Sequence, residues 1–335
     1  MAPTAPAASG RAPRRPSAQR VVAGVTVVVV VVVTALVLLP DRLGLDRSVP
    51  FAVLAAFRPQ LVVVTALAAL AMIAWRRVRV AGVAALLMCL VAGALVVPRA
   101  VASTVPAPHG LELTVLSFNV DEGRADVSTL AATIRRERPD VVVLPESADR
   151  FSALLGEAIP DLGYRSSVAA SPGVDDVDGT TVLTAPGLGP LGSRVISQGR
   201  SDPWLELTGG GLGAVRLVAV HVSAPVPRKI QSWPRELAQL RTWCGAGAGP
   251  AVVVGDFNAT LDHRDFREGT RGCQDAGAAT GEGLTGTWNA AWPSWSGVQI
   301  DHVLAGGGPQ PTALRILDLP GSDHRALLAR VRLSP

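Results

Sequence analysis

The chain has 335 residues and a formal net charge of +4. Its mean hydropathy is +0.34 and only 17% of its residues are charged, which makes it too apolar for a purely soluble protein. The composition therefore excludes an ordinary soluble chain and predicts that part of the sequence lies in a membrane.

Three apolar segments before residue 100 account for the excess. They are Val21–Leu39, Leu61–Trp75 and Ala81–Val97. Each approaches the ~20 residues that cross a bilayer as a helix, so they predict three transmembrane helices within residues 21–98. Arg58 and Pro59 interrupt the second segment. It is therefore either part of a broken helix that includes Phe51–Phe57 or a short helix that starts near Gln60.

Basic residues flank the predicted spans on one side. They are Arg11, Arg14, Arg15 and Arg20, within residues 1–20, and Arg76, Arg77 and Arg79, between the second and third spans. Because basic flanks stay in the cytoplasm, three spans place everything after Pro98 on the outer side. We therefore expect a multi-pass protein of the cell membrane, with residues 99–110 as a linker and residues 111–335 as an extracytoplasmic catalytic domain. The same arginines explain the pI of 9.6 without a nucleic-acid partner.

The cysteines are distributed over both parts of the chain. Cys89 falls inside the third span, whereas Cys244 and Cys273 fall in the outer domain, which is an oxidising location if the predicted topology holds. A disulfide between the last two is a hypothesis, because sequence does not show their separation. The cysteines and histidines do not follow the spacing of a zinc site.

Residues 111–335 are enough for one domain with a large core. Short apolar runs typical of strands recur at Leu113–Phe118, Val141–Leu144, Val215–Val220, Ala251–Val254, Ile300–Leu304 and Leu327–Val331. Helical spacing of apolar residues predicts helices at Val127–Glu137 and Pro234–Cys244. The stretch Ser171–Gly192, rich in Gly and Pro, predicts a loop with one strand at Thr180–Thr184.

Most of the apolar runs end in polar residues. Polar residues at the ends of buried strands converge along one edge of the sheet, where a pocket can form. Carboxylates and amides there suit a hard cation such as Mg²⁺, and imidazoles suit a phosphate. The residues are Asn119, Glu146, His221, Asp256, Asn258, Asp323 and His324.

Six motifs in chain order carry a resemblance to a known family. They are Leu116–Asn119, Pro139–Glu146, Val220–His221, Val254–Asn258, Ile300–Leu304 and Gly321–Arg325. In order and approximate spacing they resemble the endonuclease/exonuclease/phosphatase superfamily, which includes DNase I-like nucleases, inositol-phosphate phosphatases and sphingomyelinases. The resemblance covers the whole outer domain. It implies an α/β (α+β) fold, a four-layer α/β/β/α sandwich of two face-to-face sheets with helices outside.

The resemblance implies a metal site made by Glu146, Asn119 and Asp323. The family binds Mg²⁺ through the glutamate of the Pro-Glu motif, and Mn²⁺ is an alternative ion. Asn119 would help to hold the metal or its waters, and Asp323 would ligate it directly or through water. The structural alternatives are a solvated carboxylate at a strand end and an Asx turn after a strand.

The resemblance also implies catalytic roles for five residues. Asp256 and Asn258 would orient the attacking water and bind the scissile phosphate. Asp301 would orient His324 and favour its imidazolium form beside the phosphate. His221 would face the phosphate. Whether Asp256 or His324 accepts the proton of the water stays open.

The remaining histidines of the domain are expected to be structural. His302 alternates with Asp301 along its strand and should point to the opposite face, and His263 carries no motif. Trp288 falls where relatives often have an aromatic residue near the substrate. Two further tryptophans close by make a packing or membrane-interface cluster an equal interpretation, so Trp288 is given no role.

These inferences predict a membrane-anchored, Mg²⁺-dependent phosphoesterase that hydrolyses a phosphodiester by in-line attack of water. Its partner is a phosphate-ester substrate, either a nucleic acid or a phospholipid headgroup. The domain has a single lysine and no obvious basic stripe for a nuclease, whereas a tethered enzyme meets lipids at high effective concentration. The strand at Thr180–Thr184 lacks the basic residue with which the family usually ends it, so the substrate stays open. The alternative is a non-catalytic, membrane-tethered binding module that retains the fold.

Overall fold

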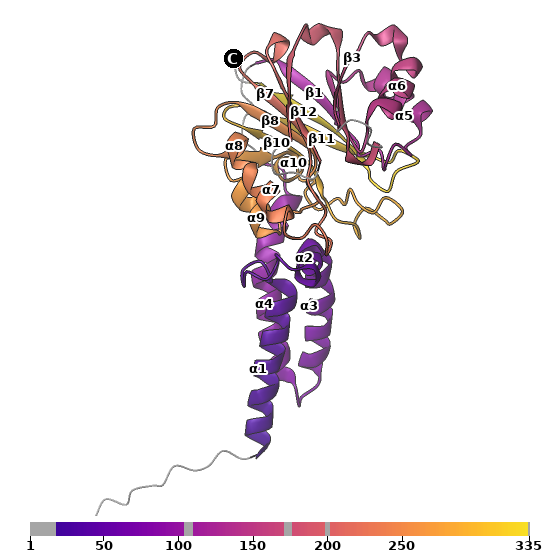
Figure 1. The fold of residues 1–335 in the computed structure, drawn as a ribbon. Coiled ribbons are helices and arrows are strands. Elements are labelled where there is room, and N and C mark those ends of the chain that lie inside the picture. The colour runs from indigo at the N-terminus through magenta and orange to yellow at the C-terminus, as the bar shows by residue number, and fades with distance from the viewer. Residues whose placement is uncertain (1–17, 104–109, 171–175, 198–201, 334–335) are drawn as a thin grey trace, which may run out of the picture.

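The computed structural model describes residues 18–103, 110–170, 176–197 and 202–333. These residues form a stem of apolar helices and a globular domain that sits on one end of it (Figure 1). Parts of the predicted cytoplasmic N-terminus, the predicted linker and the loop at Ser171–Gly192 lie outside the described residues.

The stem contains α1 (Ala18–Leu38), α2 (Val49–Ala56), α3 (Arg58–Ala74) and α4 (Arg79–Val96). Two helices are long and apolar enough to cross a membrane, α1 and the helix from Arg79 to Ala100. The second segment agrees with the broken-helix alternative, because α2 and α3 meet at an angle of 80°. Of the three predicted spans, the first and the third therefore correspond to single helices that are long enough to cross a membrane. The middle segment is a third span only if the bent pair crosses as one unit.

The surface of the stem is apolar. Valines that are at least half exposed recur along the whole length of α1: Val21, Val22, Val25, Val28, Val29, Val32 and Val33. An exposed apolar surface of this extent is typical of a region that contacts a membrane or another protein. The start of α1 and the turn between α3 and α4 both lie at the end of the stem remote from the globular domain (Figure 1).

The globular domain contains two six-stranded sheets. Their strand orders are β11-β12-β1-β2-β4-β3 and β5-β6-β7-β8-β10-β9. The strands are β1 (Glu112–Ser117), β2 (Val141–Pro145), β3 (Arg165–Ala169), β4 (Thr180–Thr184), β5 (Gly192–Ile196), β6 (Trp204–Thr208), β7 (Arg216–His221), β8 (Ala251–Asp256), β9 (Cys273–Asp275), β10 (Asp301–Gly306), β11 (Gln310–Leu317) and β12 (Ala326–Arg332). The helices are α5 (Val127–Glu137), α6 (Asp149–Ala158), α7 (Trp233–Gln239), α8 (Arg241–Cys244), α9 (Arg264–Gly269) and α10 (Ala276–Thr280).

Alternation along the strands produces the layers. In β2, Val141 and Val143 pack between the two sheets, whereas Val142 and Leu144 pack beneath α5 and α6. The strands of the second sheet divide in the same way between the central core and a cluster under α7, α8 and α9. Successive strand residues point to opposite faces, so a strand that is apolar throughout must be covered on both sides. The result is the predicted α/β/β/α sandwich.

The apolar runs in the sequence locate the central strands well and the edge strands poorly. The seven predicted strands all form, including β4 at Thr180–Thr184. The strands β3, β5, β6, β9 and β11 were not predicted. Of these, β3 and β5 are edge strands whose residues are largely exposed, so they lack a continuous apolar run. The predicted helix at Pro234–Cys244 is divided at Leu240 into α7 and α8. The hypothetical disulfide between Cys244 and Cys273 is confirmed, and it ties α8 to β9.

A buried ionic network joins the stem to the globular domain. Arg58, the first residue of α3, is fully buried. Its guanidinium donates to Asp262 at 2.6 Å and pairs with Asp41. Arg99 binds the other oxygen of Asp262 at 2.7 Å, and Arg267 binds Asp41 at 2.6 Å. Arg58, which interrupts the second apolar segment in the sequence, therefore lies at the junction.

The predicted linker also belongs to this junction where it is described. Besides the pairing of Arg99, the backbone N–H of Ser103 donates to Ala279 O at 2.8 Å. At least these residues of the 99–110 segment are therefore packed against the domain rather than free of it.

Candidate active site

Three neighbouring strands of one sheet place three of the predicted residues side by side. In the register of β7, β8 and β10, His221 and Asp301 lie on either side of Asp256. Cross-strand partners point to the same face of a sheet. All three side chains are buried, so the ends of these strands gather two carboxylates and an imidazole away from water.

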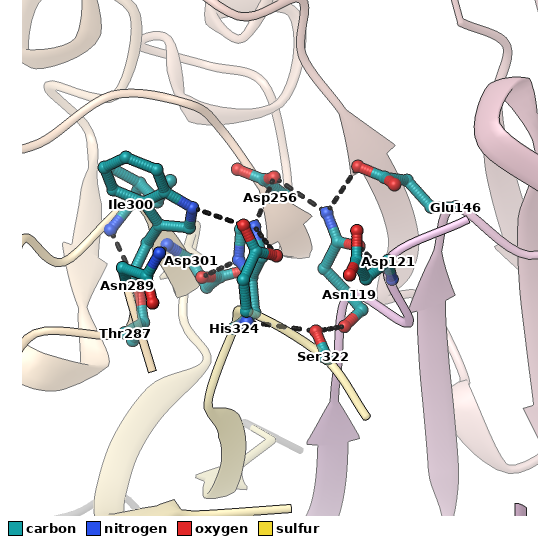
Figure 2. Close-up of polar contacts among 12 residues, drawn as sticks. Asn119, Asp121, Glu146, Asp256, Thr287, Asn289, Ile300, Asp301, Ser322 and His324 are labelled. Atoms are coloured by element: carbon teal, nitrogen blue, oxygen red, sulfur yellow. Dashed lines mark hydrogen bonds and ion pairs between the residues drawn. The ribbon is translucent and has the colours of Figure 1, made fainter. Parts of the chain in front are cut away.

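The other sheet contributes Asn119 and Glu146, which follow the parallel strands β1 and β2. Asn119 Nδ2 donates to Glu146 Oε1 and to Asp256 Oδ2, each at 3.0 Å (Figure 2). Asn119 Oδ1 accepts the backbone N–H of Asp121 at 2.9 Å, which determines the orientation of the amide. Asn119 thus links a carboxylate of one sheet to a carboxylate of the other, and its nitrogen rather than its oxygen faces them.

Two site residues have a strained backbone. Glu146 and Asn258 have φ values of 57° and 46°, in the left-handed region that residues other than glycine rarely occupy. Gly255, just before Asp256, is required for a different reason, because a Cβ there would lie 1.9 Å from Val220 O. After this close approach the chain turns, and the Asn258 backbone N–H donates to Asp256 Oδ1 at 2.7 Å. The turn and its hydrogen bond hold Asp256 at the edge of the sheets. The surrounding structure imposes the left-handed conformations of Glu146 and Asn258.

His324 lies against Asp301. Its Nδ1 is 2.9 Å from Asp301 Oδ2, and its Nε2 is 3.8 Å from Asp256 Oδ2. Burial lowers the pKa of His324, but the charge and hydrogen bond of Asp301, with the charges of Asp256 and Asp323, outweigh it and raise the pKa to about 10. His324 is therefore a cation at neutral pH, the form that attracts a phosphate.

Asp256 is the carboxylate that all parts of the site share. Burial, followed by the charge of Asp301, raises the pKa of Asp256 to about 6, against the opposing effect of the two histidines. Ligand atoms of Glu146, His221 and Asp256 lie within 4.8 Å of one another, and so do those of Asp256, Asp301 and His324. A divalent cation would stabilise carboxylates that are crowded and buried in this way, and oxygen donors suit a hard ion. The residues present therefore fit a metal site.

Asp323, which the sequence places among the metal ligands, belongs to neither group of donor atoms. Its side chain is 41% exposed, and its Oδ1 lies 3.8 Å from His324 Nε2. Its Oδ2 accepts the indole N–H of Trp288 at 2.8 Å. Trp288, which was assigned no role from the sequence, is therefore in contact with the site.

Sequence reasoning missed two hydroxyls that support the site. Ser322 Oγ donates to Asn119 O at 2.8 Å and accepts the backbone N–H of His324 at 3.0 Å (Figure 2). Thr287 Oγ1 accepts the backbone N–H of Asp301 at 3.2 Å. Ser322 lies inside the Gly-Ser-Asp-His motif and could have been found there. Thr287 lies outside all six motifs, so no motif pointed to it.

A third residue that the sequence did not single out is Asp202, which precedes β6. Its Oδ2 lies 3.8 Å from His221 Nδ1 and 3.8 Å from Lys229 Nζ. Burial raises the pKa of Asp202 to about 6, although the charges of His221 and Lys229 oppose the rise. Asp202 thus lies near His221 Nδ1 without the hydrogen bond that joins Asp301 to His324. The Ser-Asp-Pro sequence around Asp202 gave no signal of that position.

The two histidines predicted to be structural are confirmed as such. His302 is buried, with Nδ1 2.7 Å from Asp275 Oδ2 and Nε2 2.9 Å from Ala259 O. His263 is buried with Nε2 2.9 Å from Ala52 O in α2. Both rings are fully used by packing and hydrogen bonds away from the site.

The comparisons with known proteins agree with this geometry. Residues 116–324 match the model of the Endonuclease/Exonuclease/phosphatase family. Among curated protein sequences, none matches the chain significantly. A humanized TDP2 of D. rerio superposes with a TM-score of 0.53 at 18% identity, over 66% of this chain and 99% of that one. An endonuclease/exonuclease/phosphatase from Beutenbergia cavernae superposes with a TM-score of 0.51 at 20% identity, over 67% of this chain and 72% of that one. TDP2 from C. elegans superposes with a TM-score of 0.53 at 18% identity, over 66% of this chain and 75% of that one.

The family match covers every one of the six motifs from Leu116 onward, up to His324 in the last. The folds of these relatives agree with the sandwich described above, and the site residues lie where the two sheets meet. The chain therefore belongs to the Endonuclease/Exonuclease/phosphatase family and is a metal-dependent hydrolase that acts on phosphoric ester bonds.

Proposed function

We propose that the protein is a membrane-anchored, Mg²⁺-dependent phosphodiesterase whose catalytic domain, residues 111–335, lies on the outer side of the cell membrane. The observation that carries the proposal is the continuous set of contacts from Glu146 through Asn119 and Asp256 to the His324–Asp301 pair. This set combines acidic donors for a cation with a positively charged imidazole for a phosphate.

Glu146 would be the principal metal ligand, and waters of the metal would complete its surroundings, since Asp323 lies outside both groups of donor atoms. Asn119 holds Glu146 in place through its amide nitrogen. Mg²⁺ or Mn²⁺ bound there would stabilise negative charge on the phosphoryl oxygens. The crowding of buried carboxylates around Asp256 supports this assignment.

The remaining residues would bind the phosphate and activate water. Asn258 and His221 would contact the phosphoryl oxygens, and imidazolium His324, oriented by Asp301, would stabilise the charge that develops on them. Asp256 would hold the attacking water and take its proton, since its raised pKa of about 6 suits a general base near neutral pH. The water oxygen bonds to phosphorus, the ester P–O bond breaks, and the leaving alcohol takes up a proton.

Membrane anchoring with an outer catalytic domain is supported by two features of the stem and one of the globular domain. Its helices expose apolar side chains along their length. The arginines at the start of α1 and in the turn between α3 and α4 lie at the same end, as expected for a cytoplasmic face (Figure 1). The Cys244–Cys273 disulfide, in the globular domain at the other end, suits an oxidising outer compartment.

Substitution of the glutamate tests the function. The full chain in detergent is assayed on bis-p-nitrophenyl phosphate with Mg²⁺ and with EDTA. We expect Glu146→Gln to lower metal-dependent turnover by at least about a hundredfold and to weaken Mg²⁺ binding measured by calorimetry, because an anionic ligand is lost.

The matched control is Glu157→Gln, an exposed position of α6, which should change neither quantity. Full turnover by Glu146→Gln would contradict the proposed role of this residue. A folded wild-type chain that binds Mg²⁺ but cleaves no phosphoester would favour the binding module instead.

A further inference from the structure

A cavity of about 370 Å³ lies between α2 and the globular domain. The helix contributes one wall, and the segment Ala224–Pro227 forms another. Trp288, Trp292 and Ile300 form a third. The volume falls in the range of small-molecule pockets and is more than twice that of the ~150 Å³ apolar cavity that stays dry and binds benzene. The cavity is therefore large enough to take an apolar ligand.

One side of this cavity adjoins the active site. Asn258 lines the cavity, and its Nδ2 lies 3.3 Å from Asp256 Oδ2. Trp288 also lines it, while the indole N–H of the same residue binds Asp323. A molecule that fills the cavity therefore contacts two residues that themselves contact the carboxylates of the site.

The other end opens where the membrane surface would lie. The lining residues Val53, Val226 and Trp292 remain 44–48% exposed, so they mark a mouth rather than a closed wall. Helix α1 has 21 residues, which gives about 30 Å, the thickness of the hydrocarbon core. Since α2 follows α1 at its domain end and turns by 80° into α3, it lies at the outer boundary of that layer.

The side chains around the mouth are typical of a membrane interface. Trp295 is 75% exposed, and its backbone carbonyl lies next to Gln60 near the start of α3. The exposed Arg228 directly follows the apolar segment Ala224–Pro227, where it can meet anionic headgroups. Among the described residues that line the cavity itself, none is a lysine or arginine. A nucleic-acid strand needs a basic channel, so it does not fit these walls.

We propose that this cavity receives a hydrocarbon chain of a membrane phospholipid and delivers its phosphodiester to the active site. The inference rests on the proposed function and narrows it to a lipid substrate that is drawn from the surrounding bilayer. Tail and headgroup are then recognised separately: the apolar walls bind the chain, and the metal site with His324 binds the phosphate.

Filling the cavity tests the proposal. The full chain is placed in liposomes of phosphatidylcholine and phosphatidylglycerol, and cleavage of these lipids is compared with cleavage of bis-p-nitrophenyl phosphate. Val53→Trp should lower lipid cleavage by about tenfold or more and change the soluble substrate by less than about twofold. Val195→Trp is the matched control, because Val195 is 50% exposed on β5, as Val53 is 48% exposed on α2. It should change neither rate.

A binding measurement separates this proposal from the proposed function. The same liposomes carry a phosphatidylcholine with a diazirine in one acyl chain, and the sites of photo-crosslinking are mapped by mass spectrometry. We expect adducts on residues 49–57 and 224–227 that Val53→Trp suppresses and Val195→Trp does not.

Each outcome of the two experiments decides one question. Adducts only on α1 and α4, or adducts that Val53→Trp leaves unchanged, would overturn the lipid site even if bis-p-nitrophenyl phosphate is hydrolysed. An equal loss of both activities in Val53→Trp would also overturn it. Adducts in the cavity without cleavage of any phosphoester would support the lipid site and overturn the proposed function.

Discussion

In the described part of the globular domain, two buried aspartate–histidine pairs share a hydrogen bond, and only one of these two belongs to the site. Asp301 lies 2.9 Å from His324, and Asp275 lies 2.7 Å from His302. In both, negative charge outweighs burial and raises the pKa of the histidine. Their surroundings differ, because His324 faces Asp256, whereas His302 packs between aromatic rings. The chemistry therefore depends on what the second ring nitrogen meets.

Because the two pairs differ in this way, Asp301→Asn and Asp275→Asn can be compared as matched variants. Asp301→Asn removes the charge that raises the pKa of His324 to about 10, so the imidazolium should lose its proton at a lower pH. We expect turnover to fall by about a hundredfold or more, and the alkaline limb of the pH–rate profile to move to lower pH. The measurement is kcat against pH on bis-p-nitrophenyl phosphate.

Asp275→Asn is the control for the loss of a buried charge pair. It should lower the temperature of unfolding and leave the pH–rate profile of the remaining folded enzyme in place. If the two variants shift the profile alike, Asp301 has no special role in orienting His324.

At the scale of elements, the stem is fixed to the domain by charges rather than by a flexible linker. The network of Arg58, Asp41, Asp262, Arg99 and Arg267 lies between α3, the segment after α1 and the start of α9. Buried charges are costly unless they are paired, so loss of one partner leaves the others uncompensated. This rigid junction also holds α2 against the domain, where His263 binds Ala52 O.

The contribution of the junction is measurable through Arg58. We expect Arg58→Met to lower the free energy of unfolding by about 3–5 kcal/mol, since two buried aspartates lose a partner. The control is Arg47→Met, because the Arg47 side chain is 59% exposed and pairs with Asp265. Exposed pairs contribute about 1 kcal/mol or less. Unfolding in detergent is followed by circular dichroism, and equal effects of the two variants would contradict a dominant role for Arg58.

At the scale of the whole molecule, the stem and the site make one functional unit. The end of the stem where α1 begins is remote from the globular domain, whereas α2 lies next to the domain (Figure 1). The cavity beside α2 is therefore at the domain end of the stem. In the proposed orientation, anchoring would do more than restrict the enzyme to a surface. It would place the mouth of the cavity where a lipid can enter without leaving the bilayer.

Thiol labelling of intact cells tests this orientation. Ser193→Cys, exposed on β5, should react with a membrane-impermeant maleimide, whereas Arg77→Cys, in the turn between α3 and α4, should react only after the membrane is permeabilised. The native cysteines should not interfere, because Cys89 is buried and the other two form the disulfide. The reverse labelling pattern would place the domain in the cytoplasm.

Much of the fold could be predicted from the sequence because its signals are local. Continuous apolar runs indicated the central strands, since a strand covered on both faces must be apolar at every position. The exposed edge strands β3 and β5 carry no such run, so they were missed. The length of an apolar segment located α1 and α4, but it could not show the 80° bend between α2 and α3.

The sequence by itself determined the family, the sandwich and the set of residues at the strand ends, because order and composition along the chain carry that information. Only the tertiary structure decided how these residues act together. The amide nitrogen of Asn119 faces the carboxylates, Asp323 stands apart beside Trp288, and Asp202 supports His221. Arg58 binds Asp262, which is 204 residues away in the chain. Residues of α2 line one cavity together with Asn258 and Trp288. Such contacts depend on how distant segments pack, which no local pattern encodes.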